Sequence, residues 1–217
     1  MSRNPFVRFL RFLFFAVIVR AVILVALGLT VRHRERLPKR GPAVLAGNHN
    51  SNLDALAIMS LMPLRLLPKL RPVAAMDYFL TGGFRSWFAT NIIGIIPVKR
   101  GSGKDGNPLK LAEEALDRGE ILVIFPEGSR GEPETLQEFK KGIGHLAQAR
   151  PEVPVVPVFM HGLGKALPRG LLVLVPFNAT VSVGEPLYGT ATYSEFVSKL
   201  QRAIADLAAA EKLPAWE

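Results

Sequence analysis

Cysteine is absent from this chain of 217 residues. Its absence excludes thiolate catalysis, disulfide bonds and zinc sites built on cysteine. Acidic residues are scarce at the N-terminus, where residues 1–40 hold nine Arg and Lys against one acid, Glu35, while the other residues hold eighteen bases and seventeen acids. Because nucleic-acid-binding domains usually carry their basic surface on the folded body, this distribution argues against nucleic acid as a partner.

Several catalytic motifs are also missing. The chain has neither the G-x-S-x-G of a serine nucleophile elbow nor the H-E-x-x-H of a zinc protease. Gly103-Lys104 is similar to the end of a nucleotide-binding P-loop, but Asp105 stands where Ser or Thr must bind magnesium. We therefore predict no metal site; a site that combines His49, Asp54, His145 and His161 is the alternative, but no spacing argues for it.

Long apolar runs are confined to the N-terminus. The twenty residues from Phe12 to Val31 carry one charge, on Arg20, and have the length that a helix needs to cross a bilayer core. On an ideal helix, Arg11 and Arg20 would lie on opposite sides. Basic residues on both flanks favour an anionic membrane, and we expect the cell inner membrane with the rest of the chain on its cytoplasmic face. A helix that enters one leaflet, a buried core helix and a cleaved signal peptide are the alternatives.

The rest of the chain alternates apolar strand patterns with helix patterns. This alternation predicts an α/β fold with a central, mostly parallel or mixed sheet flanked by helices, preceded by the hydrophobic membrane helix. We expect residues 1–40 to be the anchoring segment and residues 41–217 to be one folded domain. The expected strands are 43–47, 73–75, 95–98, 120–125, 155–160, 171–175 and 179–183, and the expected helices are 53–62, 84–93, 107–119, 135–149 and 192–211. Capping boxes at Thr135 and Thr192 predict the starts of the last two helices.

His49 and Asp54 follow the first expected strand of this domain. Histidine is suited to act as a general base, and a neighbouring carboxylate can fix its tautomer. Residues five apart on one ideal helix point about 140° away from each other. The pair therefore requires His49 in a loop and Asp54 in the first turn of the next helix. A loop histidine beside a helix-capping aspartate, without catalysis, is the alternative.

A second candidate motif is Phe125 to Gly131 (FPEGSRG), directly after an expected strand. Sites gather at strand ends in α/β folds. The free N–H of Gly128 and the guanidinium of Arg130 are suited to hold a phosphate. A surface turn with an ion pair between Glu127 and Arg130 is the alternative.

Two other runs complete the set. Residues 94–104 join an apolar run to the basic residues Lys99, Arg100 and Lys104, which suit either phosphate binding or a solvated loop. Val153 to Val158 contains two prolines, which is typical of an edge strand that lines an apolar groove, with core packing as the alternative.

Together the four blocks resemble the 1-acylglycerol-3-phosphate acyltransferase family of glycerolipid acyltransferases. Order and spacing agree over about residues 40–185. Pro97 stands where many members have an aromatic residue, and Gly131 where serine is frequent, so the departures concern the choice of acceptor. The family blocks are met by His49 and Asp54 (His-x-x-x-x-Asp), by Gly94 to Arg100 (an apolar run ending in a base), by Phe125 to Arg130 (Phe-Pro-Glu-Gly-Thr/Ser-Arg), and by Val153 to Pro157 (an apolar proline block).

The resemblance implies a membrane-bound enzyme that moves a fatty acyl group from acyl-CoA or acyl-carrier protein to the hydroxyl of lysophosphatidic acid, giving phosphatidic acid, without a cofactor. It implies that His49 is the base and that Asp54 orients it. The implied substrate-binding residues are Lys99, Arg100, Lys104, Glu127, Gly128, Ser129 and Arg130, of which Arg100 and Arg130 bind the acceptor phosphate while Glu127 and Gly128 help to place the glycerol.

Three alternatives stay open. In the first, the acceptor is a different lysolipid, either a lyso-aminolipid or another lysophospholipid. In the second, the protein binds lipid at the membrane without catalysis. In the third, it is a metal-dependent hydrolase of phosphate esters.

Overall fold

The computed structural model describes residues 4–76, 82–98, 107–131, 135–166 and 178–211. At its centre is a sheet in which seven described strands follow the order β1-β7-β6-β2-β5-β3-β4. The described strand pairs are parallel except β6 with β7, which is antiparallel. This confirms the predicted α/β class with a mixed, mostly parallel sheet. The strands are β1 (Thr30–Arg32), β2 (Ala43–Gly47), β3 (Leu70–Ala75), β4 (Ile96–Val98), β5 (Ile121–Ile124), β6 (Val155–His161) and β7 (Thr180–Val183).

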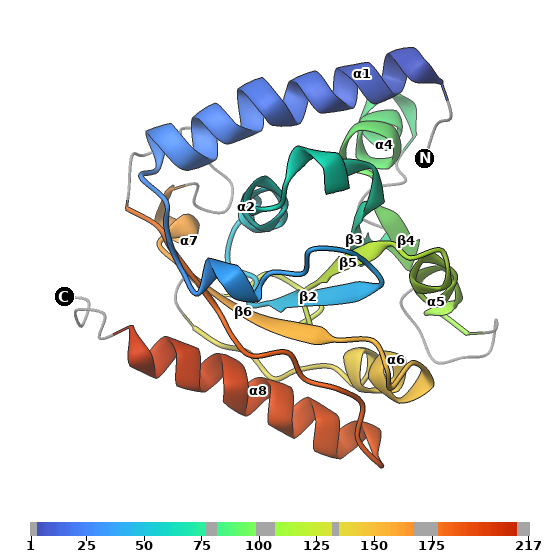
Figure 1. Ribbon diagram of the computed structural model, residues 1–217, viewed down its shortest axis with the longest axis vertical. Coiled ribbons are helices and arrows are strands. Elements are labelled where there is room, and N and C mark those ends of the chain that lie inside the picture. Colours follow the sequence, from blue (N-terminus) through green and yellow to red (C-terminus); the bar gives the residue numbers. More distant parts are fainter. Residues whose placement is uncertain (1–3, 77–81, 99–106, 132–134, 167–177, 212–217) are drawn as a thin grey trace.

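Helices cover both faces of the sheet (Figure 1). On one face, α5 (Lys110–Asp117), α6 (Gly142–Ala149) and α8 (Tyr193–Ala210) share a hydrophobic core with the strands. On the other face lie α2 (Asp54–Leu61) and η4 (Leu64–Lys69). A further helix crosses above α2, so α2 is buried over most of its circumference, as an apolar helix of a core should be.

The helix above α2 is built from α1 (Pro5–Leu13) and two π-helical segments, η1 (Phe14–Val19) and η2 (Ala21–Ala26). We call these three segments the N-terminal helix; they form one rod in Figure 1. On an ideal α-helix, each residue lies about 40° further around the helix axis than the residue four positions before it, so a line of every fourth residue would gradually turn away from the body. The wider π-helical winding turns less per residue, which keeps such a stripe facing the body. The buried stripe is Arg11, Phe15, Val19, Ile23 and Leu27.

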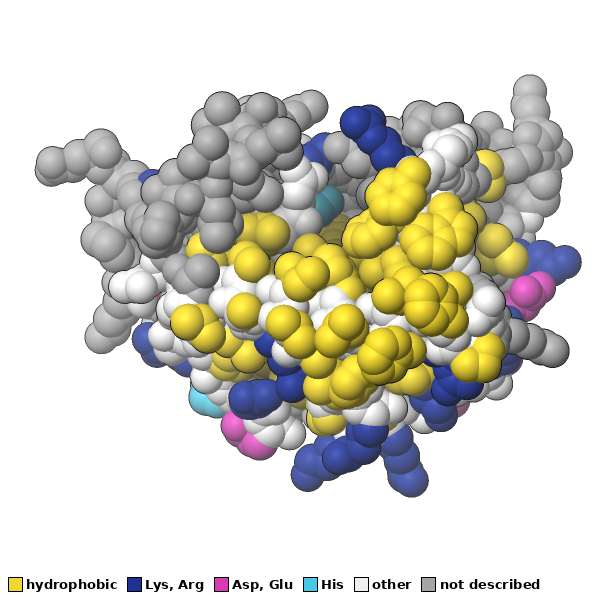
Figure 2. All heavy atoms as spheres, turned by 90° about the horizontal axis from the view of Figure 1, so that it is seen from above, with side chains coloured by type: hydrophobic (Ala, Val, Ile, Leu, Met, Phe, Trp, Pro, Cys, Tyr) yellow, Lys and Arg dark blue, Asp and Glu magenta, His cyan; other side chains and the backbone are white. Residues whose placement is uncertain are grey.

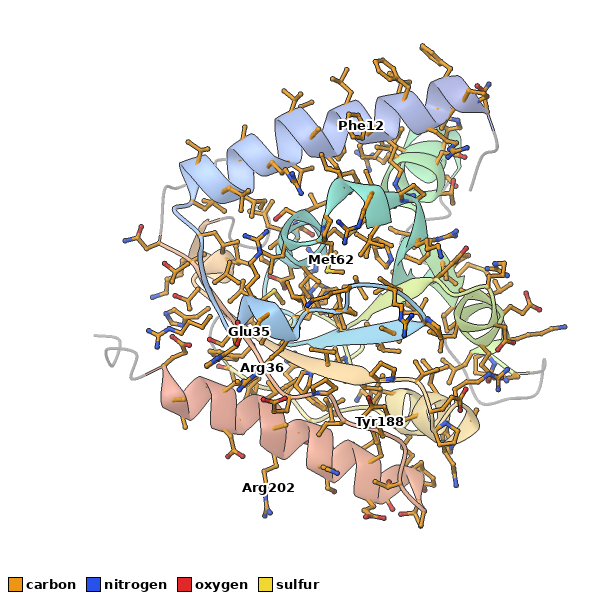
Figure 3. All side chains as sticks on the ribbon, in the orientation of Figure 1. Phe12, Glu35, Arg36, Met62, Tyr188 and Arg202 are labelled. Carbon is orange, nitrogen blue, oxygen red and sulfur yellow. The ribbon has the colours of Figure 1, made fainter. Side chains whose placement is uncertain are left out.

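This winding corrects the expectation that Arg11 and Arg20 lie on opposite sides. An Nη2 donor of Arg11 bonds the carbonyl oxygen of Leu70 at 2.9 Å and that of Ile93 at 3.3 Å. Arg20 donates from its Nη2 to the carbonyl oxygen of Met62 at 3.0 Å, and Figure 3 labels Met62 below the N-terminal helix. Both guanidinium groups therefore bond to carbonyls of the body. Burial lowers the pKa of Arg11 to about 10, and the nearby charge of Arg71 adds to the effect.

The expectation of one helix from Phe12 to Val31 is wrong at its C-terminal end. The helical rod ends at Ala26, and Thr30–Arg32 instead pairs with β7 as strand β1. In the part of the chain that the structure describes, we find no single helix with both the length and the apolar character that a bilayer crossing requires. The predicted boundary near residue 40 stays a prediction, although residues on both sides of it share one hydrophobic core.

The two capping-box predictions have different outcomes. The hydroxyl of Thr192 accepts the N–H of Glu195 and begins α8, as predicted. In contrast, α6 begins at Gly142 rather than at Thr135. The residues before α6 pack along the turn after β5, where the N–H of Lys140 donates to the carbonyl oxygen of Pro126 at 2.8 Å. Tertiary packing therefore overrides the local helix signal.

The remaining elements are mostly as expected. The predicted helix at 84–93 is confirmed as α4 (Gly83–Phe88) followed by the π-helical η5 (Ala89–Ile93). The expected strand at 171–175 lies outside the described residues. Among the described residues, three short helices were not predicted: η3 (Arg34–Arg36), η4 and α7 (Leu163–Ala166).

Candidate active site

His49 and Asp54 meet at the carboxyl end of the central strand β2. The strand ends at Gly47 and α2 begins at Asp54, so His49 lies in the connecting loop. The Nδ1 atom of His49 is 2.9 Å from Oδ2 of Asp54. This confirms the placement that the sequence predicted for the pair. The aspartate side chain is buried, whereas 22% of the histidine side chain is exposed.

The same oxygen of Asp54 accepts two backbone N–H groups of the loop. The N–H of Asn50 lies 2.7 Å from Oδ2 and that of Ser51 2.8 Å. Because this oxygen serves as an acceptor, Nδ1 of His49 carries the proton that it donates. In a neutral imidazole with this tautomer, the other ring nitrogen, Nε2, is the acceptor.

The FPEGSRG block holds His49 from the neighbouring strand end. The backbone N–H of His49 donates to Oε1 of Glu127 at 3.3 Å, and its carbonyl oxygen accepts the N–H of Gly131 at 2.9 Å. The ring of Phe125 stacks on the imidazole with centroids 4.1 Å apart and planes inclined by 15°. The first and third blocks therefore form one structural unit around the histidine.

Asn48 fixes the start of the loop against β6. Its side-chain amide donates to the carbonyl oxygen of Met160 at 2.8 Å, and its Oδ1 accepts the N–H of Met160 at 2.7 Å. The side chain continues the ladder between β2 and β6 by one step. Asn48 was not predicted as a functional residue, because its partner lies 112 positions away in the sequence.

Glu127 is a buried carboxyl, with 1% of the residue exposed. Burial raises its pKa to about 7, and the charge of Asp54 adds to that rise, against the lowering effect of the N–H groups of His49 and Gln137. The side chain faces the loop of His49, which the sequence did not predict.

Gly128 occupies a tight turn and has a φ of +74°, a conformation that favours glycine. Its N–H donates to the carbonyl oxygen of Phe125 at 3.0 Å. The expectation that this N–H is free for phosphate is therefore wrong. Ser129, the next residue, is exposed.

Arg130 points to the loop of the first block. Its Nη1 donates to Oδ1 of Asn52, two residues before Asp54. The structure therefore brings the guanidinium beside the His49 loop. Asn52 was missed because no local pattern indicates a contact between residues 78 positions apart.

The other two blocks are placed differently. Lys99, Arg100 and Lys104 lie outside the described residues, directly after β4 and beyond it. The fourth block forms the first part of β6, which lies between β2 and β7 and is buried. The edge-strand interpretation is therefore wrong, and the core-packing alternative is confirmed.

The other candidate metal ligands belong to different elements, α6 and β6. The ring of His145 on α6 packs against Tyr193 with centroids 4.3 Å apart, and His161 is buried at the end of β6. Within the described ranges, we find no three His, Cys, Asp or Glu side chains close enough together to hold a metal ion.

Comparison with protein families gives a match to the sequence model described as Acyltransferase, over residues 28–161. The chloroplastic 1-acyl-sn-glycerol-3-phosphate acyltransferase of Brassica napus is 32% identical over 72% of this chain and 44% of its own length. The alpha form of the mouse enzyme of that name is 30% identical over 66% of this chain and 48% of its own length. A taffazin of Dictyostelium discoideum is 29% identical over 72% of this chain and 58% of its own length. The chain thus spans about half the length of these relatives.

Among solved structures, the 1-acyl-sn-glycerophosphate acyltransferase of Thermotoga maritima superposes with a TM-score of 0.72. The alignment covers 98% of this chain and 89% of that protein, at 21% sequence identity. At this identity the likeness concerns the fold.

Proposed function

Because the chain belongs to the acyltransferase family, we propose that it moves a fatty acyl group from acyl-CoA or acyl-carrier protein to the free hydroxyl of lysophosphatidic acid, giving phosphatidic acid. The observation that carries the proposal is the pair of His49 and Asp54, whose Nδ1 and Oδ2 atoms are 2.9 Å apart. Such a pair is suited to remove a proton from a hydroxyl.

In the proposed reaction, Nε2 of His49 takes the proton of the acceptor hydroxyl while its oxygen attacks the thioester carbonyl. Asp54 holds the ring and stabilises the imidazolium that forms. The carbon–sulfur bond then breaks, and the imidazolium returns the proton to the leaving thiolate. The products are an ester and a free thiol, so the reaction needs no cofactor and no covalent intermediate. Alignment of the two substrates supplies much of the lowering of the barrier.

We propose that Arg130 binds the acceptor phosphate together with Arg100, Lys99 and Lys104. The bond between Arg130 and Asn52 supports this role, because it holds the guanidinium at the loop that carries the base. Gly128 is proposed to help place the glycerol, and Ser129 to belong to the substrate-binding residues. Arginine suits phosphate because its donors form two parallel hydrogen bonds with two oxygens.

Glu127 was predicted to help place the glycerol, and that contact stays a prediction. We propose in addition that Glu127 positions His49, since Oε1 accepts the backbone N–H of His49 in a buried environment. The carboxyl would then act on the reaction through the orientation of the base.

We also propose that the protein lies on the cytoplasmic face of the cell inner membrane through the N-terminal helix. The outer side of this helix exposes a row of apolar residues to solvent, and Figure 2 looks onto that side. A helix of this kind suits the boundary between headgroups and acyl chains, where the proposed substrates are concentrated. The exposed residues are Phe6, Phe9, Phe12, Leu13, Val17, Ile18, Leu24 and Val25.

A second candidate is acyl transfer to another lysolipid. The match to a taffazin alongside the 1-acyl-sn-glycerol-3-phosphate acyltransferases supports it, because the shared family does not fix the acceptor. A lyso-aminolipid without a phosphate would remove the role proposed for Arg130.

The direct test is release of thiol from palmitoyl-CoA by the purified protein, with a panel of lysolipids as acceptors. We expect the highest rate with lysophosphatidic acid. General-base catalysis contributes roughly a hundredfold to ten-thousandfold, so His49→Ala should lower kcat by about that factor. Asp54→Asn should also lower kcat strongly, because the aspartate acceptor is lost. His145→Ala is the matched control and should keep the wild-type rate, since its ring packs against Tyr193.

Full activity of both site variants would refute the mechanism. A highest rate with a different lysolipid would favour the second candidate. No thiol release with any acceptor, together with vesicle binding, would favour the non-catalytic alternative. Phosphate release that chelators abolish would favour the hydrolase.

A further inference from the structure

Helix α4 exposes two large aromatic side chains. Of Phe84, 73% is accessible to solvent, and of Trp87, 39%. Their rings contact each other with centroids 5.9 Å apart, so they form one exposed aromatic pair. Exposure of this much aromatic surface is unfavourable in water and indicates a binding partner.

The aromatic pair lies beside the N-terminal helix, although the two segments are far apart in the sequence. The next aromatic residue of α4, Phe88, packs edge-to-face on Phe14 with centroids 5.3 Å apart. The segment η5 that continues α4 is bonded through the carbonyl oxygen of Ile93 to Arg11. The two helices are therefore held together as neighbours, as Figure 1 shows.

The exposed apolar side chains of both helices form a continuous face, with basic side chains at its margins (Figure 2). Exposed arginines stand on both helices, Arg8 on α1 and Arg85 on α4. An apolar centre with a cationic margin complements an anionic bilayer, whose chains accept the apolar residues while its phosphates attract the arginines. Tryptophan also favours this boundary.

From this charge pattern we propose that Phe84 and Trp87 form a second contact with an anionic phospholipid bilayer, beside the contact proposed for the outer side of the N-terminal helix. The inference rests on the membrane association in the proposed function. One helix in a membrane surface leaves the body able to rotate about the helix axis, whereas a second contact beside it sets the orientation. Since α4 and η5 lead through Gly94 into β4 and the second block, this contact would hold that block at the bilayer surface.

Tryptophan fluorescence tests the inference directly. The chain contains two tryptophans, Trp87 and Trp216, so Trp216→Phe leaves Trp87 as the reporter. The variant is mixed with vesicles of phosphatidylglycerol and phosphatidylcholine, with and without brominated acyl chains. We expect the emission maximum of Trp87 to shift to shorter wavelength on binding, because the ring enters the apolar boundary. For the same reason, brominated chains should lower the emission intensity about twofold.

Binding strength gives a second measurement. Loss of both aromatic side chains in Phe84→Ala with Trp87→Ala should weaken vesicle binding about tenfold in co-sedimentation. Tyr188→Ala is the matched control, because 52% of Tyr188 is exposed on the side of the molecule away from the N-terminal helix (Figure 3). It should bind like the wild type.

The outcomes separate this inference from the proposed function. If the wild type binds vesicles but Trp87 shows no shift and no quenching, the second contact is refuted and membrane association stands. If the double variant binds as tightly as the Tyr188 control, the second contact is also refuted. If the wild type does not bind vesicles, both membrane proposals fail, whereas thiol release still tests the acyl transfer.

Discussion

At the scale of single residues, His49 is held by partners from two other parts of the chain, the start of α2 and the segment that follows β5. Asp54 bonds the ring from the helix that follows, and Phe125 stacks on it from the position directly after β5. Glu127 accepts the backbone N–H of His49, and Gly131 donates to its carbonyl oxygen. The imidazole is thus restrained in both position and rotation. Such preorganisation matters because a displacement of about 1 Å of a reacting group can cost about a hundredfold in rate.

Glu127 is the residue that best tests this restraint. Glu127→Ala removes the acceptor of the His49 N–H, so we expect kcat to fall by roughly tenfold to a hundredfold while KM changes less than about twofold. Glu127→Gln keeps an oxygen at the same place and should retain most of the activity. A large rise in KM in both variants would instead indicate that Glu127 contacts the glycerol. Steady-state kinetics with lysophosphatidic acid distinguishes the two results.

The raised pKa of Glu127 also predicts how stability depends on pH. Folding raises this pKa from 4.5 to about 7, so between these values the folded state keeps a proton that the unfolded chain releases. The resulting stability is present below about pH 4.5 and is lost as the pH rises through about 7. Relative to Glu127→Gln, the free energy of unfolding of the wild type should fall by at most about 3 kcal/mol over this range. Urea unfolding of both proteins at several pH values measures this loss. If the free energy of unfolding changed equally with pH in the two proteins, the burial of the carboxyl would be contradicted.

At the scale of elements, the N-terminal helix is attached to the body by its buried stripe and by Arg11. The guanidinium of Arg11 bonds carbonyls at the ends of η4 and η5, where a cation also interacts favourably with the helix dipoles. It thereby joins the helix to the segment that leads into the second block. The close approach of Gly94 shows how tight this region is, because a Cβ there would lie 2.6 Å from Nη1 of Arg11.

We therefore expect Arg11→Met to destabilise the protein. It removes the donor from the carbonyl oxygens of Leu70, in a buried bond, and of Ile93, in a partly buried one, at a cost of roughly 2–4 kcal/mol in the free energy of unfolding. Arg8→Met on the same helix is the control, and because Arg8 is exposed its effect should stay within about 0.5 kcal/mol. Thermal or urea unfolding compares the two, and similar losses in both would show that the contacts of Arg11 contribute little.

At the scale of the whole molecule, the two layers of helices have different surroundings. The N-terminal helix has one side in the core, and its other side is exposed and apolar. The other helical layer, α5, α6 and α8, packs on the opposite face of the sheet. Among the described residues, most of the large exposed apolar side chains therefore lie on the side of the N-terminal helix and α4.

This uneven distribution predicts salt-dependent membrane binding. Val17→Ser with Ile18→Ser, at two positions of the N-terminal helix that are each 55% exposed, should weaken binding to phosphatidylglycerol vesicles at every salt concentration. Wild-type binding should also fall as salt rises, because screening weakens the attraction of the arginines. Leu111→Ser on α5 is the control. Co-sedimentation measures binding, and a double variant that binds like this control would refute the role of the outer side of the helix.

The sequence alone determined the α/β class, most strands, the start of α8, and the positions of His49 in a loop and Asp54 in the first helical turn. These features depend on apolar periodicity, strand ends and capping residues, which act over a few neighbouring positions. Only the tertiary structure decided that Glu127 and Phe125 hold His49, that β6 is interior, that α6 starts at Gly142, and that the N-terminal helix keeps its stripe on the body. These features depend on contacts between residues far apart in the sequence, where packing outweighs local propensity.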